Sequence, residues 1–178
     1  IKEQPFTNSP DSRYYFNSTQ HAEALLRLEH AARSNVGLAL LVGDIGAGKT
    51  TLARRMLDDL DEKEYESALL VVVHSSITPE WLLKKIGLQL GVVNVPNGKI
   101  EILAAIYHRL LKIREEGRKA IVLIDEAQML QTRELMEEFR GLLNLELPAQ
   151  KLVTFIFFAL PSIDRNLALD EPLKQRVA

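Results

Sequence analysis

The chain has 178 residues, no cysteine and a formal net charge of −2. Its length suffices to bury one sizeable core, and the absence of cysteine excludes disulfides, zinc–thiolate sites and thiol catalysis. The small charge gives no electrostatic sign of a nucleic-acid partner, and no apolar run approaches the ~20 residues that a membrane-spanning helix needs. A cysteine-free chain fits a reducing, cytoplasmic setting, and the start at Ile1 rather than Met leads us to expect a piece of a longer protein.

Strand and helix patterns alternate along the chain, which is typical of an α/β fold. Residues 5–18 are rich in Pro, Asn, Ser and Tyr and are predicted to form an irregular arm. Ser18 or Thr19 is a suitable cap for a helix that runs to about Arg33. Apolar periodicity then predicts strands over residues 38–42, 68–73, 120–124 and 152–158, and helices over residues 50–60, 79–90, 100–116 and 132–145.

A glycine-rich loop lies between the first of these strands and the helix after it. Its sequence, GDIGAGKT over residues 43–50, matches G-x-x-x-x-G-K-[ST] at every fixed position. Backbone N–H groups of such a loop and the dipole of the following helix together bind phosphates. Lys49 is expected to reach the β- and γ-phosphates, and the Thr50 hydroxyl to ligate Mg²⁺. The residues predicted to contact the nucleotide here are Gly43, Asp44, Ile45, Gly46, Ala47, Gly48, Lys49, Thr50 and Thr51.

Two carboxylates follow the third predicted strand, where Asp125 and Glu126 end the apolar run over residues 120–124. In open parallel sheets ligands bind beyond the carboxyl ends of the strands, so Asp125 is expected at the same edge as the glycine loop. There Asp125 would hold Mg²⁺ through water, and Glu126 would polarise the water that attacks the phosphate. A solvated Asp-Glu pair is the alternative, and the upstream glycine loop disfavours it.

Further short motifs accompany these two sites along the whole chain. They are PFTNSPDSRYYF over residues 5–16, His21, IDEAQ over residues 124–128, LLNLE over residues 142–146 and LKQRV over residues 173–177. With them the chain resembles the AAA+ P-loop ATPases of the general secretion pathway protein A type. Related ATPases that regulate transposition share much of the pattern, so that assignment stays open.

The resemblance implies a parallel sheet of strand order 5-1-4-3-2 with helices on both faces. Four of these strands are visible here, so the fifth strand and a helical lid are expected to follow residue 178. Residues 1–178 would then form a C-terminally incomplete nucleotide-binding core for ATP or ADP with Mg²⁺. In that core residues 1–19 are an arm near the adenine, and residues 20–178 are an αβα sandwich.

The resemblance also implies roles for four residues outside the two motifs. Tyr15 and His21 belong to the region that wraps the adenine. Arg176 stands where such ATPases often place an arginine finger, which acts on a neighbouring subunit and requires a homo-oligomer, either a ring or a dimer. His74 follows the second predicted strand, where it would hydrogen-bond Glu126 and hold it unproductive. A surface arginine and a simple strand-end histidine are the alternatives.

One position departs from the family. Leu160 occupies the place of a polar sensor residue just before Pro161 at the end of the fourth predicted strand. A leucine side chain cannot hydrogen-bond the γ-phosphate or the attacking water, and loss of one such contact costs on the order of 10–1000-fold in rate. We therefore expect slow hydrolysis.

Two functions remain open from the sequence. The first is an oligomeric Mg-ATPase that drives assembly or remodelling with a protein partner of a secretion or assembly machine. The second is a nucleotide-gated module that barely hydrolyses ATP and recruits a protein or DNA, although the net charge does not support DNA. In either case the expected location is the cytoplasm, with attachment to the inner face of a bacterial inner membrane only through regions beyond this chain.

Overall fold

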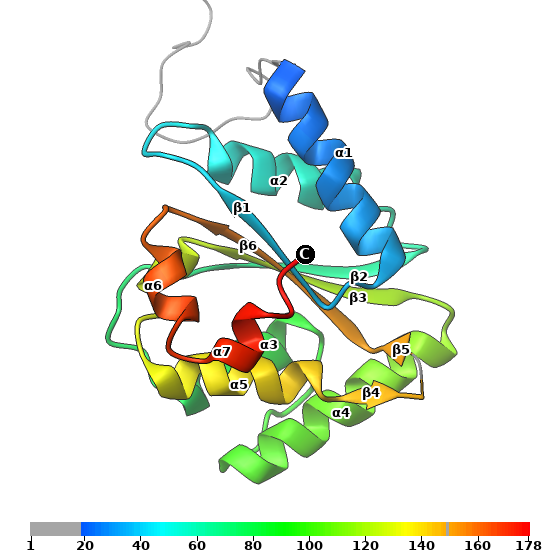
Figure 1. Cartoon of the computed structure of the whole chain (residues 1–178). Helices are drawn as coiled ribbons and strands as arrows, with labels where there is room; N and C mark the ends of the chain where they lie inside the picture. Colours follow the sequence, from blue (N-terminus) through cyan, green and yellow to red (C-terminus); the bar gives the residue numbers. More distant parts are fainter. Residues whose placement is uncertain (1–18, 149) are drawn as a thin grey trace, which may run out of the picture.

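The computed structural model describes residues 19–148 and 150–178 of the chain. Four parallel strands form the central sheet in the order β1-β6-β3-β2 (Figure 1). Their bounds are β1 Leu38–Val42, β2 Tyr65–Val71, β3 Lys119–Asp125 and β6 Val153–Ala159. Counted as strands 1 to 4 of the predicted fold, this is the order 1-4-3-2, as the family resemblance implied for the strands within the chain.

Helices cover both faces of the sheet (Figure 1). The helices α1 and α2 pack on one face, while α3, α4 and α5 pack on the other. The bounds are α1 Thr19–Ser34, α2 Lys49–Asp59, α3 Pro79–Gln89, α4 Lys99–Glu115, α5 Arg133–Leu143, α6 Ile163–Leu167 and α7 Glu171–Lys174, with a 3₁₀ turn η2 at Ala127–Met129. The α/β class and the two-sided helix layers are therefore confirmed.

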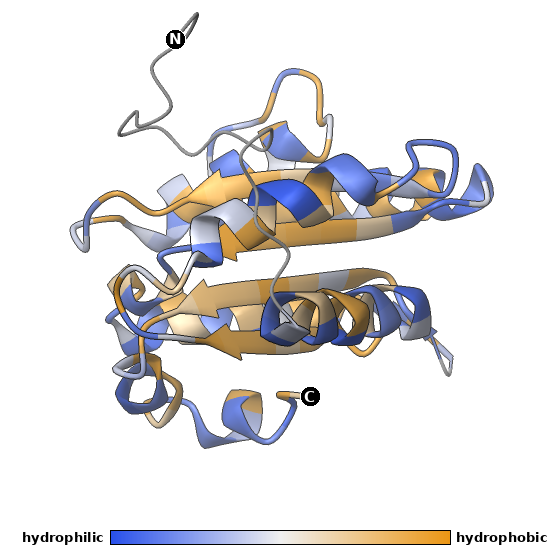
Figure 2. Ribbon diagram, turned by 90° about the horizontal axis from the view of Figure 1, so that it is seen from above, coloured by the Kyte–Doolittle hydropathy of each residue, from blue (hydrophilic) through white to orange (hydrophobic). Residues whose placement is uncertain are grey.

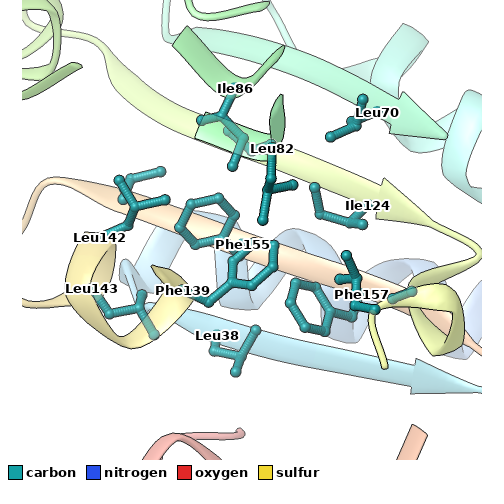
Figure 3. Close-up of a cluster of buried hydrophobic side chains, with 14 of the residues drawn as sticks. Leu38, Leu70, Leu82, Ile86, Ile124, Phe139, Leu142, Leu143, Phe155 and Phe157 are labelled. Carbon is teal, nitrogen blue, oxygen red and sulfur yellow. The ribbon is translucent and has the colours of Figure 1, made fainter. Parts of the chain in front are cut away.

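Side chains of the central strands belong to two separate hydrophobic cores, one on each face of the sheet. Along β6, Phe155 and Phe157 point to the α5 side, whereas Ile156 and Phe158 join the cluster under α1 and α2. Alternation with a period of two places neighbours on opposite faces, so a strand covered by helices on both sides is apolar throughout. The ring of Phe139 from α5 packs edge-on against Phe155 and Phe157, with centroids 5.1 and 4.9 Å apart (Figure 3). Figure 2 shows the strands hydrophobic along most of their length.

Local signals in the sequence explain where several helices begin. Thr78 caps α3, since its hydroxyl accepts a hydrogen bond from the Trp81 N–H at 3.2 Å, and Pro79 suits the first helical position. Thr132 caps α5 in the same way through the Leu135 N–H. These caps satisfy amide groups that have no partner inside the helix.

The structure differs from the predicted elements at three places. The strand predicted over residues 68–73 runs from Tyr65 to Val71, because its ladder with β3 pairs Tyr65 with Lys119 and ends opposite Asp125. A short hairpin, β4 Glu146–Leu147 with β5 Gln150–Lys151, precedes β6. The helices α6 and α7 were not predicted, because each spans five residues or fewer and shows too little periodicity.

The outer edge of β1 carries the last residues of the chain. Val177 forms a parallel bridge with Leu38, and the Ala178 N–H donates to the Leu38 carbonyl at 2.9 Å. This is the edge on which the predicted strand order has a fifth strand. Within the described residues, none of the helices combines the length and the apolar character needed to cross a membrane.

Candidate functional site

The glycine loop connects the carboxyl end of β1 to the first residue of α2. Its first residue is tied to the sheet, because the Gly43 N–H donates to the Ala159 carbonyl at the end of β6 at 3.1 Å. Gly48 has φ 78°, a left-handed conformation that favours glycine, and a Cβ at this position would lie 3.0 Å from the His21 ring. The chain therefore turns tightly here and presents the N-terminus of α2 to the edge of the sheet.

The Lys49 side chain bends back over the loop from which it starts. Its Nζ donates to the carbonyls of Gly43 and Asp44, both at 2.8 Å, and the residue is only 8% exposed. The ammonium group thus braces the loop in this structure, and Lys49 lines a cavity next to it. A positive charge with three donors at this place can also bind phosphate oxygens.

Thr50 and Asp125 meet although 75 residues separate them in the sequence. The Thr50 hydroxyl donates to Asp125 Oδ2 at 2.7 Å, and Asp125 is 1% exposed. A hydroxyl and a carboxylate are hard oxygen ligands of the kind that Mg²⁺ prefers. The pair therefore fits a magnesium ion beside a nucleotide, with Thr50 and Asp125 as the residues that would hold it.

Glu126 follows in an unusual backbone conformation, with φ 56° and ψ 37°. Left-handed non-glycine residues cost free energy and often occur at functional sites. The turn is stabilised because the Glu126 N–H donates to Asp125 Oδ1 at 2.9 Å. Its carboxylate accepts a hydrogen bond from the side-chain amide of Gln128, which lies in η2. Glu126 thus faces the loop from the neighbouring part of the sheet edge.

These residues surround one cavity of about 280 Å³ at the carboxyl edge of the sheet. Its lining residues are Ile45, Gly46, Gly48, Lys49, Thr50, Thr51, Glu126 and Leu160. The cavity thus brings together residues of the glycine loop, one of the two strand-end carboxylates and the leucine at the sensor position. Gly43, Asp44 and Ala47 belong to the same loop but do not line the cavity.

A second, larger cavity of about 600 Å³ lies between α1 and the outer edge of β1. Leu28, Ala31, Leu40 and Val42 line it, together with Ala178. It contains none of the predicted phosphate-binding or carboxylate residues, so the smaller cavity is the candidate site.

His21 in α1 reaches the glycine loop. Its Nε2 lies 2.9 Å from the Ala47 carbonyl, so this nitrogen carries the proton and donates. The expected contact with adenine stays a prediction, and the described geometry shows His21 supporting the loop. The other predicted adenine contact, Tyr15, falls outside the described residues.

In this structure, which describes both residues, no hydrogen bond joins His74 to Glu126, and the expected contact between them stays a prediction. The second strand ends at Val71, two residues earlier than expected, because its pairing with β3 stops at Asp125. His74 is exposed and its ring lies 6.5 Å from that of Trp81. Among the described residues, Gln128 and not His74 hydrogen-bonds the Glu126 carboxylate.

Arg176 lies away from the cavity of its own chain. It directly precedes Val177, which bridges Leu38 at the start of β1, whereas the glycine loop follows the end of that strand. Lys151, and to a smaller extent Arg176, lower the pKa of the Glu146 carboxyl, so Arg176 stands near the β4–β5 hairpin. From this position Arg176 has no role at its own phosphate site, and an arginine-finger role would need a neighbouring subunit.

Sequence reasoning missed Gln128, which contacts two parts of the site. Its amide oxygen accepts from the Leu160 N–H at 3.1 Å, while its nitrogen bonds Glu126. The motif IDEAQ contained it, but only the tertiary structure places the end of β6 within its reach.

Comparison with known proteins assigns this chain to a family. A family model described as an AAA domain matches residues 32–167. The curated general secretion pathway protein A of Aeromonas hydrophila is 31% identical over 179 aligned residues. That alignment covers all of this chain but only 32% of the relative, so the chain spans about a third of that protein's length.

Solved structures share the fold at lower identity. The ORC2 protein of Aeropyrum pernix, in its ADPNP–ADP complexes, has a TM-score of 0.65 at 17% identity, covering 89% of this chain and 45% of that one. A Walker-type ATPase of Pyrococcus abyssi has a TM-score of 0.56 at 23% identity, covering 86% and 48%. These likenesses show the fold alone. Together with the family match over residues 32–167, they show that the chain belongs to the AAA domain family and has the AAA+ P-loop fold.

Proposed function

We propose that this AAA+ domain hydrolyses ATP to ADP and phosphate with Mg²⁺, and that it does so as part of an oligomer engaged in assembly or remodelling. The observation that carries the proposal is the contact of Thr50 with Asp125, which joins the glycine loop to the carboxylate edge beside Glu126. A phosphate cradle, a cation, a magnesium ligand pair and a carboxylate base are the parts that phosphoryl transfer to water requires.

The chain's own residues divide the reaction between them. The loop N–H groups and Lys49 bind the phosphates and stabilise the negative charge that shifts to them in the transition state. Glu126 orients a water molecule and accepts its proton while the oxygen attacks the γ-phosphorus and the bond to the ADP oxygen breaks. Bound Mg²⁺, held by Thr50 and Asp125, would neutralise charge on the β- and γ-phosphates.

The relation to the secretion protein supports the assembly role. The aligned relative is named for general secretion, and it matches this chain from end to end. We therefore propose a protein partner within a secretion-type or similar assembly machine, and a cytoplasmic position for this domain. The finer assignment rests on that likeness and not on a described binding surface.

A second function, that of a nucleotide-gated recruitment module, is favoured by one observation. Leu160 lines the phosphate cavity where the family has a polar side chain, so one donor that would stabilise the transition state is missing. Slow hydrolysis would leave the domain in its ATP-bound state long enough to recruit a protein or DNA. The net charge of −2 gives DNA no particular support.

The test is Mg²⁺-dependent phosphate release, measured over a series of protein concentrations for the unaltered chain and Glu126→Gln. We expect the substitution to lower turnover on the order of 10²–10⁴-fold, since the general base is lost. ATP affinity should stay unchanged, because Glu126 does not bind the phosphates.

Glu62→Gln is the matched control, because Glu62 is exposed and lies outside the cavity. Turnover retained in Glu126→Gln would refute the assignment of the base. ATP binding without measurable hydrolysis in the unaltered chain would favour the recruitment function.

A further inference from the structure

Gln128 is buried at the centre of a short chain of hydrogen bonds that ends at the proposed base. It is 8% exposed and lies in η2, two residues after Glu126. The left-handed turn at Glu126 reverses the backbone, so the Gln128 side chain returns toward the Glu126 carboxylate. Its amide nitrogen donates to Glu126 Oε2. A buried amide whose nitrogen and oxygen both form hydrogen bonds is costly to replace and fixes its neighbours in place.

The contact of the Gln128 side-chain oxygen determines which way the amide group is oriented. Its Oε1 lies 3.1 Å from the Leu160 backbone nitrogen, and a backbone N–H can only donate. The oxygen must therefore face Leu160 and the nitrogen must face Glu126, which is a carboxylate and accepts. The Gln128 carbonyl in turn accepts from Asn166 Nδ2 at 2.8 Å, which anchors the turn to α6.

The contact of Gln128 with Leu160 does not depend on the leucine side chain. The leucine side chain cannot hydrogen-bond a phosphate or a water, but its backbone N–H still marks the end of β6 beside the cavity. Gln128 connects this fixed point to Glu126. Among the described residues it is also the only side chain that hydrogen-bonds the Glu126 carboxylate.

We propose that Gln128 is a positioning residue for ATP hydrolysis, which holds the Glu126 carboxylate in place against the end of β6. The inference rests on the proposed function, because it requires Glu126 to act on the attacking water. Loss of a hydrogen bond that supports a metal ligand lowers activity about 10- to 100-fold, and we expect an effect of the same order for Glu126. Gln128 does not line the phosphate cavity, so nucleotide affinity should not depend on it.

The experiment is a double-mutant cycle between Gln128→Met and Glu126→Ala. Methionine has nearly the same length and volume as glutamine but no amide. Single-turnover hydrolysis of γ-labelled ATP is measured with the protein in excess, and ATP Kd is measured by titration. We expect Gln128→Met to slow hydrolysis about 10- to 100-fold and to change Kd less than threefold. In the Glu126→Ala background the same substitution should change the residual rate less than twofold, because its target is gone.

Two further variants control for folding and for local chemistry. Gln131→Met changes an exposed glutamine three residues along the same connection and should leave the rate unchanged. Gln128→Asn keeps the amide but shortens its reach by about 1.5 Å, so it should also slow hydrolysis several-fold. If thermal unfolding shows that Gln128→Met does not fold, the asparagine variant takes its place in the cycle.

The outcomes separate this inference from the proposed function. Glu126→Ala with full activity, or an unaltered chain without hydrolysis, would contradict the proposed function and this inference with it. A slow Glu126→Ala with a fast Gln128→Met would overturn the role of Gln128 alone. An equal loss from Gln128→Met in both backgrounds would also overturn it, because the residue would then act on folding rather than through Glu126.

Discussion

At the scale of single residues, the site depends on polar groups that are nearly buried and paired with one another. Lys49 and Asp125 are 8% and 1% exposed, and each has hydrogen-bond partners inside the site. Burial of a charge is tolerable only with such partners. Two backbone carbonyls of the glycine loop accept hydrogen bonds from the Lys49 ammonium.

Lys49→Ala should weaken ATP binding about 10- to 150-fold, because a hydrogen bond to a charged group contributes roughly 1.5–3 kcal/mol. Equilibrium titration with a fluorescent ATP analogue measures this change. Lys63→Ala, at an exposed position outside the cavity, is the control and should bind normally. An unchanged affinity in Lys49→Ala would place the nucleotide elsewhere in the molecule.

At the scale of elements, ion pairs connect the end of α4 to the amino ends of β2 and β3. Arg118 pairs with Glu66 and Glu116, and Arg109 of α4 pairs with Glu66 at 2.8 Å. Arg109 also donates to the Leu90 carbonyl at the end of α3, at 2.6 Å. This cluster lies at the edge of the sheet opposite the phosphate cavity, so it stabilises the arrangement of elements without contacting the nucleotide.

The cluster makes stability depend on pH through Glu116. The hydrogen bond from Arg118 holds the pKa of this carboxyl below its ordinary value of 4.5. A carboxyl whose pKa is lower in the folded state stabilises the fold above its unfolded pKa, and this contribution disappears as pH falls through the folded pKa. Glu116→Gln should therefore lower the free energy of unfolding at pH 7, and the difference should shrink as pH falls below about 4.

Urea unfolding of the unaltered chain and of Glu116→Gln across this pH range provides the measurement. Glu115→Gln serves as the control, since Glu115 is the exposed neighbouring residue at the end of α4. A difference between Glu116→Gln and the unaltered chain that is the same at pH 7 and pH 3 would contradict the assigned role of the ion pair.

At the scale of the whole molecule, the candidate phosphate site and Arg176 lie at opposite edges of the sheet. The carboxyl edge holds the phosphate cavity, while Arg176 and Val177 lie at the opposite end of β1. The Arg176 Nη1 is buried without a hydrogen-bond partner among the described residues, a state that costs free energy in the single subunit. An arginine at this end of the sheet can reach a phosphate only across a subunit interface, as the proposed oligomer requires.

If Arg176 acts across an interface, Arg176→Ala should lower turnover on the order of 10³-fold without changing ATP affinity. Turnover of the unaltered chain should also rise more steeply than linearly with protein concentration. Mixing Arg176→Ala with Lys49→Ala should restore part of the activity, because some sites then combine an intact Lys49 with a neighbour's intact Arg176. Arg165→Ala, at an exposed position, is the control. Activity that stays absent in the mixture would exclude a shared site.

The sequence by itself determined the parts of this protein that depend on local backbone geometry. The glycine loop and the apolar runs of the strands are short-range patterns, and they predicted the α/β fold class. The apolar run over residues 120–124 also placed Asp125 and Glu126 at a strand end. These features need no knowledge of which elements become neighbours. The strand order was implied by the resemblance to a known family and not by such patterns.

Only the tertiary structure decided which side chains meet across the sheet. The register between β2 and β3 ended the second strand at Val71, and Gln128 rather than His74 hydrogen-bonds Glu126. Parallel pairing of β1, β6 and β3 brought Thr50 to Asp125 and the end of β6 to Gln128, across 75 and 32 residues of sequence. Such contacts depend on which distant strands pair with one another. The residues of a single strand do not identify the strand that will lie next to it.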